Sequence, residues 1–431
     1  MNSQIKIDDK TSLRRAVLLS LMLGLTLITH YIFKSSIMAI LIKSFSAKKI
    51  PWFDVADTII SFLFFIIILL LIKVKLKFSI IVKGISYSLC FVLIIIGLLF
   101  EVSFKTNFVI ISVGLICNLL IYFATYNIWM LFASSAFNRS WLTLTIIGCG
   151  AQLGVYLGSS IGNISIDNDL VGYLPVFLGI IYFLIFFGIS LCIQKFSCAG
   201  IREQHFIETK STISQIKSIP RLPFKYSITP YIQSILLLLF LGTIYGRIVN
   251  WNIQQLADYK STIKETSTFL ATFYKSNAIL SLLVQAIITP ILLSKLNTKI
   301  GLLIQPTIGF LILLSLILQI ETSWIAWLSL IYTSIDFTVY NSFKEKLWIY
   351  TSLNDKIKSK ALSVLLIPKL TALLFSVIIL VFANNNYNLF ILILCLLIFG
   401  WVLTILICSR NYFKNEKLGV QVIKPSIDSI G

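Results

Sequence analysis

The chain has 431 residues, of which 58% are hydrophobic and 12% are charged, and its mean hydropathy is +0.93. No soluble domain could cover so much apolar surface with polar groups, so composition excludes that class. The formal net charge of +19 is spread over loops between apolar runs, where it orients helices in a membrane. We therefore expect contact with the lipid bilayer and none with nucleic acid.

Apolar runs of about 20 residues, the length that crosses a bilayer core, recur along the whole chain. They predict an all-α, polytopic membrane protein with about twelve transmembrane helices. We place these at 16–35, 53–72, 79–100, 107–133, 141–163, 171–194, 228–248, 266–293, 300–320, 322–343, 361–383 and 386–408. The N-terminal segment leads straight into a full-length span without a short apolar core or a small-residue cleavage site, so we expect no removable signal peptide.

The longest polar interval divides these spans into six and six. It predicts an N-terminal six-helix bundle over 1–194, a cytoplasmic linker over 195–227, and a C-terminal six-helix bundle with a cytoplasmic tail over 228–431. Two six-helix halves are the architecture of major-facilitator transporters, in which the substrate site lies between the halves near the midplane.

Lysine and arginine are concentrated in the loops of one side of the membrane. Because such loops stay in the cytoplasm, the bias predicts an inner-membrane protein with both termini cytoplasmic. Two loops depart from this rule, each after the first span of a half. They carry Lys43, Lys48 and Lys49 in one half, and Lys260 and Lys264 in the other.

Motifs of catalysis and metal binding are missing from the sequence. The seven cysteines lie almost entirely in apolar helical context without metal-type spacing, and there are two histidines. No GxxxxGK[ST] loop, HExxH or GxSxG motif occurs, so we expect neither ATP hydrolysis nor another enzymatic activity. We also expect no metal and no cofactor.

Several charged residues lie within or beside predicted spans, where charge is costly and usually either marks a helix end or serves a polar cavity. Lys34 could reach the interface by snorkelling, and Asp54 and Asp57 could favour the start of a helix. Lys275 and Lys369 lie deeper in their spans and indicate a cavity lining. The predominance of lysine over carboxylate suggests a cavity for an anion such as phosphate.

The fifth span has four glycines at a spacing of four, Gly150, Gly154, Gly158 and Gly162. At this spacing they form one smooth stripe against which a neighbouring helix can pack closely. The stripe indicates either a gating seam between the halves or tight packing alone.

A charged stretch runs from Asp336 to Lys360. In it, Phe343-Lys344-Glu345 and Lys356-Ile357-Lys358-Ser359-Lys360-Ala361 resemble the T-K-E-x-x-Y-I-P and K-x-K-G-K-A segments of the ATP/ADP translocases of plastids and intracellular bacteria. Phe33-Lys34-Ser35-Ser36-Ile37 is similar to another segment of that family. Ile50-Pro51-Trp52-Phe53 is similar to a third, although Asp54 then stands where the family has a nucleotide-binding lysine.

The resemblance implies a major-facilitator-like fold and transport of a nucleotide such as ATP or ADP, or of a related phosphorylated anion, by alternating access and exchange. The charges within the spans and the resemblance together give Lys34, Asp54, Lys275, Lys344, Glu345 and Lys369 as the expected substrate-binding residues, beside a cytoplasmic basic motif of Lys356, Lys358 and Lys360. We expect a monomer. The alternatives are a carrier for another organic anion or drug-like compound, a membrane-embedded transferase, and a non-transporting relative.

Overall fold

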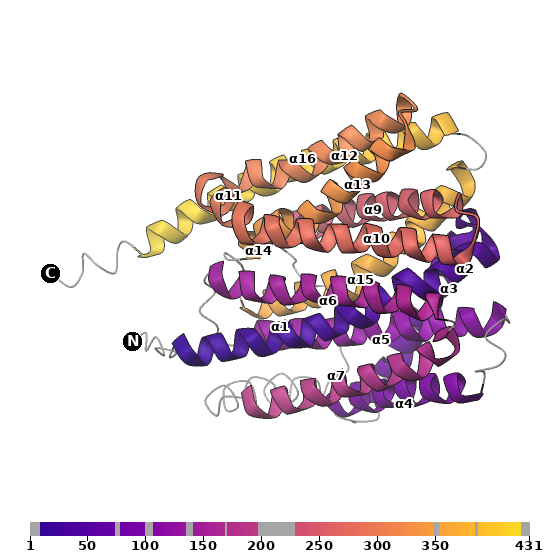
Figure 1. The fold of residues 1–431 in the computed structure, drawn as a ribbon. Helices are drawn as coiled ribbons and strands as arrows, with labels where there is room; N and C mark the ends of the chain where they lie inside the picture. The colour runs from indigo at the N-terminus through magenta and orange to yellow at the C-terminus, as the bar shows by residue number, and fades with distance from the viewer. Residues whose placement is uncertain are drawn as a thin grey trace.

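The protein is a bundle of α-helices. A computed structural model describes residues 9–73, 78–99, 107–134, 141–168, 170–196, 229–348, 351, 353–383 and 387–423. These residues contain no strand, which confirms the predicted all-α class. The start of the first helix and the end of the last helix lie at the same end of the bundle (Figure 1).

Each predicted span falls on a helical segment of the structure. In the first half of the chain the elements are α1 (Asp9–Ile32), η1 (Phe33–Ile37), α2 (Met38–Phe45), η2 (Ala47–Lys49), α3 (Ile50–Lys73), α4 (Phe78–Leu99), α5 (Asn107–Ser134), α6 (Trp141–Asp167), η3 (Leu170–Tyr173) and α7 (Leu174–Phe196). Here η1 is a π-helical turn, and η2 and η3 are 3-10 turns.

The second half begins beyond the predicted linker, most of which lies outside the described residues. Its elements are α9 (Pro230–Asp258), α10 (Ile263–Leu283), η4 (Val284–Ile288), α11 (Thr289–Lys295), α12 (Thr298–Ile317), α13 (Thr322–Ile335), η5 (Asp336–Tyr340), α14 (Asn341–Leu347), α15 (Leu353–Ile378), η7 (Ile379–Ala383) and α16 (Tyr387–Ile423). The turns η4, η5 and η7 are π-helical and continue the helices on either side.

Helices with the length and apolarity of membrane spans make up much of this bundle. Among the residues searched, six helical segments are long and apolar enough to cross a membrane, and three further apolar helices are shorter. The protein is therefore a polytopic membrane protein, as its composition indicated.

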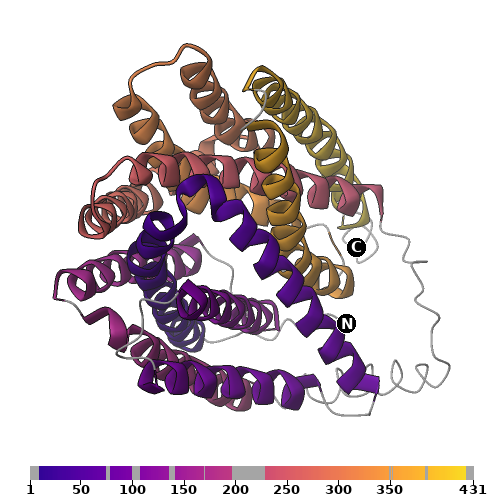
Figure 2. The same ribbon diagram turned by 90° about the vertical axis from the view of Figure 1, so that its right-hand side faces the viewer.

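The helices form two groups, which Figures 1 and 2 show on opposite sides of the bundle. We refer to α1–α7 as the N-terminal group and to α9–α16 as the C-terminal group. Two helices of the C-terminal group lie along the boundary: α10 packs on α6, and α15 packs on α3 and α5. At one end of the boundary α2 also contacts α9 and α10.

The first helix continues beyond its predicted end at residue 35. The polar run Lys34-Ser35-Ser36 does not end it, because the hydroxyls of Ser35 and Ser36 donate to the carbonyls of Tyr31 and Ile32 in the preceding turn. The chain stays helical through η1 and α2 to Phe45. Lys34 therefore lies within a helix, and its interpretation as a residue at a helix end is wrong.

Candidate functional site

A buried ion pair joins the two helix groups. Asp57 of α3 and Lys369 of α15 approach to 2.6 Å, and their side chains are 5% and 6% exposed. The Lys369 ammonium also lies 3.8 Å from the centre of the Tyr122 ring of α5. A charge this far from water must be compensated nearby, so each member of the pair holds the other in place.

A second ion pair lies one helical turn away on α3. Asp54 approaches Arg247 of α9 to 3.7 Å, and both side chains are about one fifth exposed. The Arg247 guanidinium also donates to the carbonyl of Pro368 at 3.0 Å, next to Lys369 in the chain. Two carboxylates on one face of α3 are thus each held by a cation of the C-terminal group.

Lys34 lies at the same boundary without a carboxylate partner among the described residues. Its ammonium lies 5.3 Å from the ring centre of Tyr31 on α1 and 5.4 Å from that of Tyr274 on α10. Aromatic faces attract a cation but do not neutralise it. Phe33 and Phe53, which precede Lys34 and Asp54 in the chain, both lie beside Gly114 of α5, where an added Cβ would be 3.4 Å from Phe33 and 2.9 Å from Phe53, so Lys34 and Asp54 belong to the same region of the boundary.

Local sequence explains how these side chains reach one place. Pro51 lies in the first turn of α3, a position that suits proline. Asp54 and Asp57 follow within the helix at a spacing of three, which places them on one face. Lys34 lies in the π-helical turn η1, a helical irregularity often found at functional sites. We call Lys34, Asp54, Asp57, Arg247 and Lys369 the central charge cluster.

A latch of polar contacts joins the groups at the end of the bundle remote from the start of α1. Asp258, the last residue of α9, accepts hydrogen bonds from the Ser46 hydroxyl at 2.7 Å and the Ala47 amide at 2.8 Å. Lys43 approaches its carboxylate to 3.7 Å and donates to its carbonyl at 2.7 Å. Ser46 has a φ of 65°, a strained conformation for serine that these contacts stabilise.

A more exposed contact lies beside this latch. Lys264 of α10 pairs with Asp167 of α6 at 3.3 Å. The Asn163 amide oxygen of α6 accepts from Thr268 at 3.2 Å. The α6–α10 boundary continues to Gly148, where an added Cβ would lie 3.2 Å from Gln285.

The remaining predicted substrate residues are Lys275, Lys344 and Glu345. Lys275 is half-buried on α10, one residue after Tyr274, and has no ion pair among the described residues. Lys344 pairs with Asp336 at 3.6 Å within the C-terminal group and lies 4.5 Å from the Tyr340 ring centre. Glu345 is half-buried on α14.

The basic motif begins helix α15. Lys356, Lys358 and Lys360 belong to its first turns, and their side chains lie outside the described part of the chain.

The glycine stripe of α6 packs on α1, inside the N-terminal group. A Cβ at Gly150 would meet Ser20, one at Gly154 would meet the backbone of Gly24, one at Gly158 that of Ile28, and one at Gly162 the Ser35 hydroxyl. These contacts are close packing between neighbouring helices. The stripe therefore faces a helix of its own group. This supports the interpretation of tight packing and speaks against a gating seam between the halves.

Sequence reasoning missed Arg247 and left Asp57 and Tyr122 out of the proposed binding residues. The predicted seventh span ends at residue 248, one residue after Arg247, and Arg247 is not among the predicted site residues. The helix in fact continues to Asp258, eleven residues beyond Arg247. The residues after Arg247 are polar, so the apolar run that marks the span ends before the helix does.

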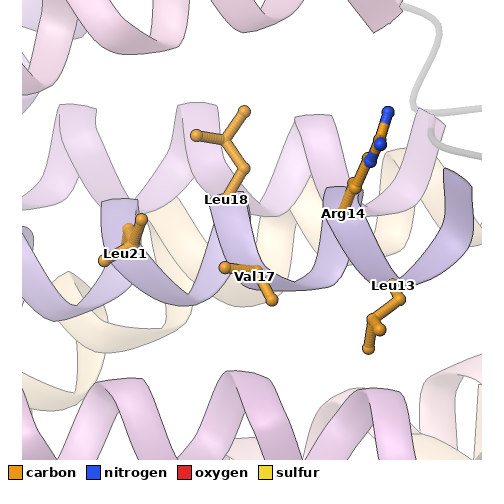
Figure 3. A pocket seen from close by; sticks show the side chains of 5 residues that line it. All are labelled: Leu13, Arg14, Val17, Leu18 and Leu21. Carbon is orange, nitrogen blue, oxygen red and sulfur yellow. The ribbon is translucent and has the colours of Figure 1, made fainter. Parts of the chain in front are cut away.

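A shallow pocket of about 380 Å³ lies on α1, away from the charge cluster. It is lined by Leu13, Arg14, Val17, Leu18 and Leu21, with Arg14 and Leu18 on one side of the helix in Figure 3. Arg14 precedes Lys34 by twenty residues, roughly 30 Å along a helix. The described residues hold no group of three or more histidine, cysteine or acidic side chains that could bind a metal.

Known proteins share the fold and little sequence. The chain has the fold of major-facilitator-type transporters. It superimposes on a POT family transporter in complex with 5-aminolevulinic acid (TM-score 0.57, 11% identity, 93% of this chain and 96% of that chain). A POT family transporter in complex with a thioalcohol-conjugated peptide gives a TM-score of 0.59 at 13% identity, with the same coverage. A D-xylose-proton symporter gives 0.57 at 11% identity, covering 94% of this chain and 98% of that chain.

No protein-family model and no curated protein matches the chain. The resemblance to the ATP/ADP translocases thus has no support beyond the residues quoted for it. The major-facilitator-like fold that it implied is confirmed by the structural neighbours.

Proposed function

We propose that the protein is a secondary transporter that moves a small organic anion across the cell inner membrane by alternating access. One observation carries this proposal. Lys34 is a cation at the boundary of the two helix groups, enclosed by tyrosines of both groups, with no carboxylate partner among the described residues. An unpaired cation within a membrane protein is costly, so a bound anion would stabilise it.

The position of the cluster suits a carrier. Asp54 and Asp57 belong to the N-terminal group, whereas Arg247 and Lys369 belong to the C-terminal group. An anion bound at Lys34 would therefore contact both groups, and rocking of one group against the other would expose it to each side in turn. The solved neighbours include proteins with small organic solutes in complex, which supports a small cargo.

Orientation and cargo are the finer parts of the proposal. The loop lysines favour placing the end of the bundle that holds the start of α1 and the end of α16 in the cytoplasm. A nucleotide exchanged for another nucleotide is the specific cargo that the ATP/ADP translocase resemblance implies. The central charge cluster supports an anion but distinguishes no nucleobase.

Uptake into bacterial cells that express the chain tests the function. Cells would be offered radiolabelled carboxylates, sugar phosphates, ATP and ADP, with and without preloading. We expect uptake of at least one anion, and its loss in Lys34→Gln. Lys299→Gln removes an exposed lysine at the start of α12 and serves as the matched control. Equal uptake by Lys34→Gln and by the parent would rule out this site.

A further inference from the structure

The charges of the central cluster do not cancel. Three cations, Lys34, Arg247 and Lys369, face two carboxylates, Asp54 and Asp57, which leaves a net charge of +1. From this imbalance we infer that the site binds a single negative charge, so that the transported substrate is a monoanion. This inference rests on the proposed anion transport and narrows its substrate class.

Neither existing ion pair is free to bind a second charge. Lys369 is held by Asp57 at 2.6 Å with both side chains nearly fully buried, and Arg247 is held by Asp54 and by the Pro368 carbonyl. A dianion would have to take one of these cations from its aspartate. The aspartate would then be a buried carboxylate without a partner, which costs more than the new contact returns.

The surroundings of the cluster do not change the count. Asp336, which acts electrostatically on Tyr31, is compensated by Lys344 within the C-terminal group. Lys275 makes no ion pair with the cluster among the described residues. His30, one helical turn before Lys34, is half-buried, its Nδ1 is buried without a hydrogen-bond partner, and an imidazole of ordinary pKa is mostly neutral at pH 7.

Lys34 is also the member that an anion can reach without displacing an aspartate. Lys34 is half-buried and its ammonium lies over two aromatic faces, which hold it in place without accepting its hydrogen bonds as an anion would. A carboxylate or monoanionic phosphate ester would supply the acceptors. The site then selects monoanions, because a second negative charge on the substrate would have to displace Asp54 or Asp57 from its cation.

Isosteric anions that differ by one charge test the inference. Purified protein would be heated with the pairs succinate and succinamate, and adipate and adipamate, and separately with ATP as a polyanion, and the same compounds would be offered to proteoliposomes. We expect the monoanionic amides to stabilise and enter about tenfold better than the parent dianions, a difference of about 1.4 kcal/mol. A preference of the parent protein for dianions or ATP would overturn the inference while leaving anion transport intact.

Variants that change the site charge sharpen the test. Asp54→Asn raises the net charge of the cluster to +2, so the preference should shift toward dianions. Lys299→Gln alters total charge far from the cluster and should leave the preference unchanged.

The outcomes separate the two proposals. If Asp54→Asn keeps the parent preference, the charge of the cluster does not select the substrate and the inference fails. If no anion of the set stabilises or enters the parent protein, the anion site of the proposed function fails as well. Asp54 is one fifth exposed and its ion pair is longer than that of Asp57, so Asp54→Asn is the variant that best preserves folding.

Discussion

Lys43 and Asp258 lie in different helix groups and meet at the end of the bundle remote from the start of α1, with 3.7 Å between ammonium and carboxylate. Lys43 belongs to one of the two loops that break the charge bias of the sequence, and Lys264, from the other loop, pairs with Asp167. Each half thus contributes one exceptional lysine and one aspartate to this end. Their departure from the orientation rule has a local cause, because each lysine pairs with a carboxylate of the opposite group.

Removing Asp258 should loosen this end of the bundle. Asp258→Ala removes two hydrogen bonds and an ion pair to the α2–α3 connection, together worth about 2 kcal/mol. In a cysteine-free background, a cysteine at the buried Ala39 of α2 should then react with a maleimide about thirtyfold faster. Glu265→Ala is the control, because Glu265 caps the Ser261 amide of its own loop. Equal rates in both variants would show that Asp258 does not hold the end closed.

The ion pair of Lys264 and Asp167 should contribute much less to closure of this end than Asp258 does. Lys264 is 67% exposed and Asp167 is 33% exposed, so water screens their attraction. Lys264→Ala should change the labelling rate of the same cysteine by less than about fivefold, which corresponds to 1 kcal/mol or less. An effect as large as that of Asp258→Ala would contradict the ranking of the two contacts by burial.

Removing one charge of the buried Asp57–Lys369 pair should destabilise the protein more than removing both. Lys369→Met leaves Asp57 as an uncompensated carboxylate and should destabilise the protein by about 3–5 kcal/mol. In Asp57→Leu/Lys369→Met neither charge is left unpaired, and most of the lost stability should return. Thermal unfolding in detergent measures both variants. If the double variant were no more stable than Lys369→Met, the pair would not be the source of the loss.

The glycine stripe should tolerate no side chain at its centre. Gly154→Ala places a methyl group against the Gly24 backbone and should force α1 and α6 apart, which lowers the unfolding temperature and the yield of folded protein. Gly400→Ala on α16 is the matched control, since an added Cβ meets nothing within 4 Å there. Alanine in that open helical position should be neutral or stabilising, by about 0.5–1 kcal/mol. A Gly154→Ala protein as stable as Gly400→Ala would contradict the close packing.

Lys275 stays a predicted substrate residue. It is a half-buried cation on α10, the helix that packs on α6 across the boundary, and it has no ion pair among the described residues. Lys275 lies outside the central charge cluster, so we expect it to act on the path of the anion and not in the charge count of the bound state: Lys275→Ala should abolish uptake while the protein inserts normally in the membrane. The two readouts are anion uptake and the amount of protein in washed membranes. Unchanged uptake would remove Lys275 from the site.

Much of the fold could be predicted because hydrophobic length is a strong signal in a membrane protein. Every predicted span coincides with a helix, and the errors lie at polar residues within helices. Lys34 was placed at a helix end, whereas the serines after it hydrogen-bond within the helix. Arg247 was overlooked for the same reason, since α9 continues through Asn250 and Gln254 to Asp258.

Partners across the boundary could not be predicted from one sequence. Asp57 and Lys369 are 312 residues apart in the chain, and nothing in their local sequence links them. The predicted positions Lys34, Asp54 and Lys369 meet in the central charge cluster, while Lys344 pairs elsewhere. Local patterns identify costly charges, but three-dimensional packing decides which of them compensate one another.

Helix α9 holds the N-terminal group at two points, Arg247 and Asp258, about 16 Å apart along one helix. The helix is continuous between them, without a proline or a π-helical turn. The two contacts therefore cannot shift independently. Binding of the proposed anion at the central cluster and closure of the Asp258 end would then be thermodynamically linked: the factor by which the anion changes the closure equilibrium is the factor by which closure changes the affinity for the anion.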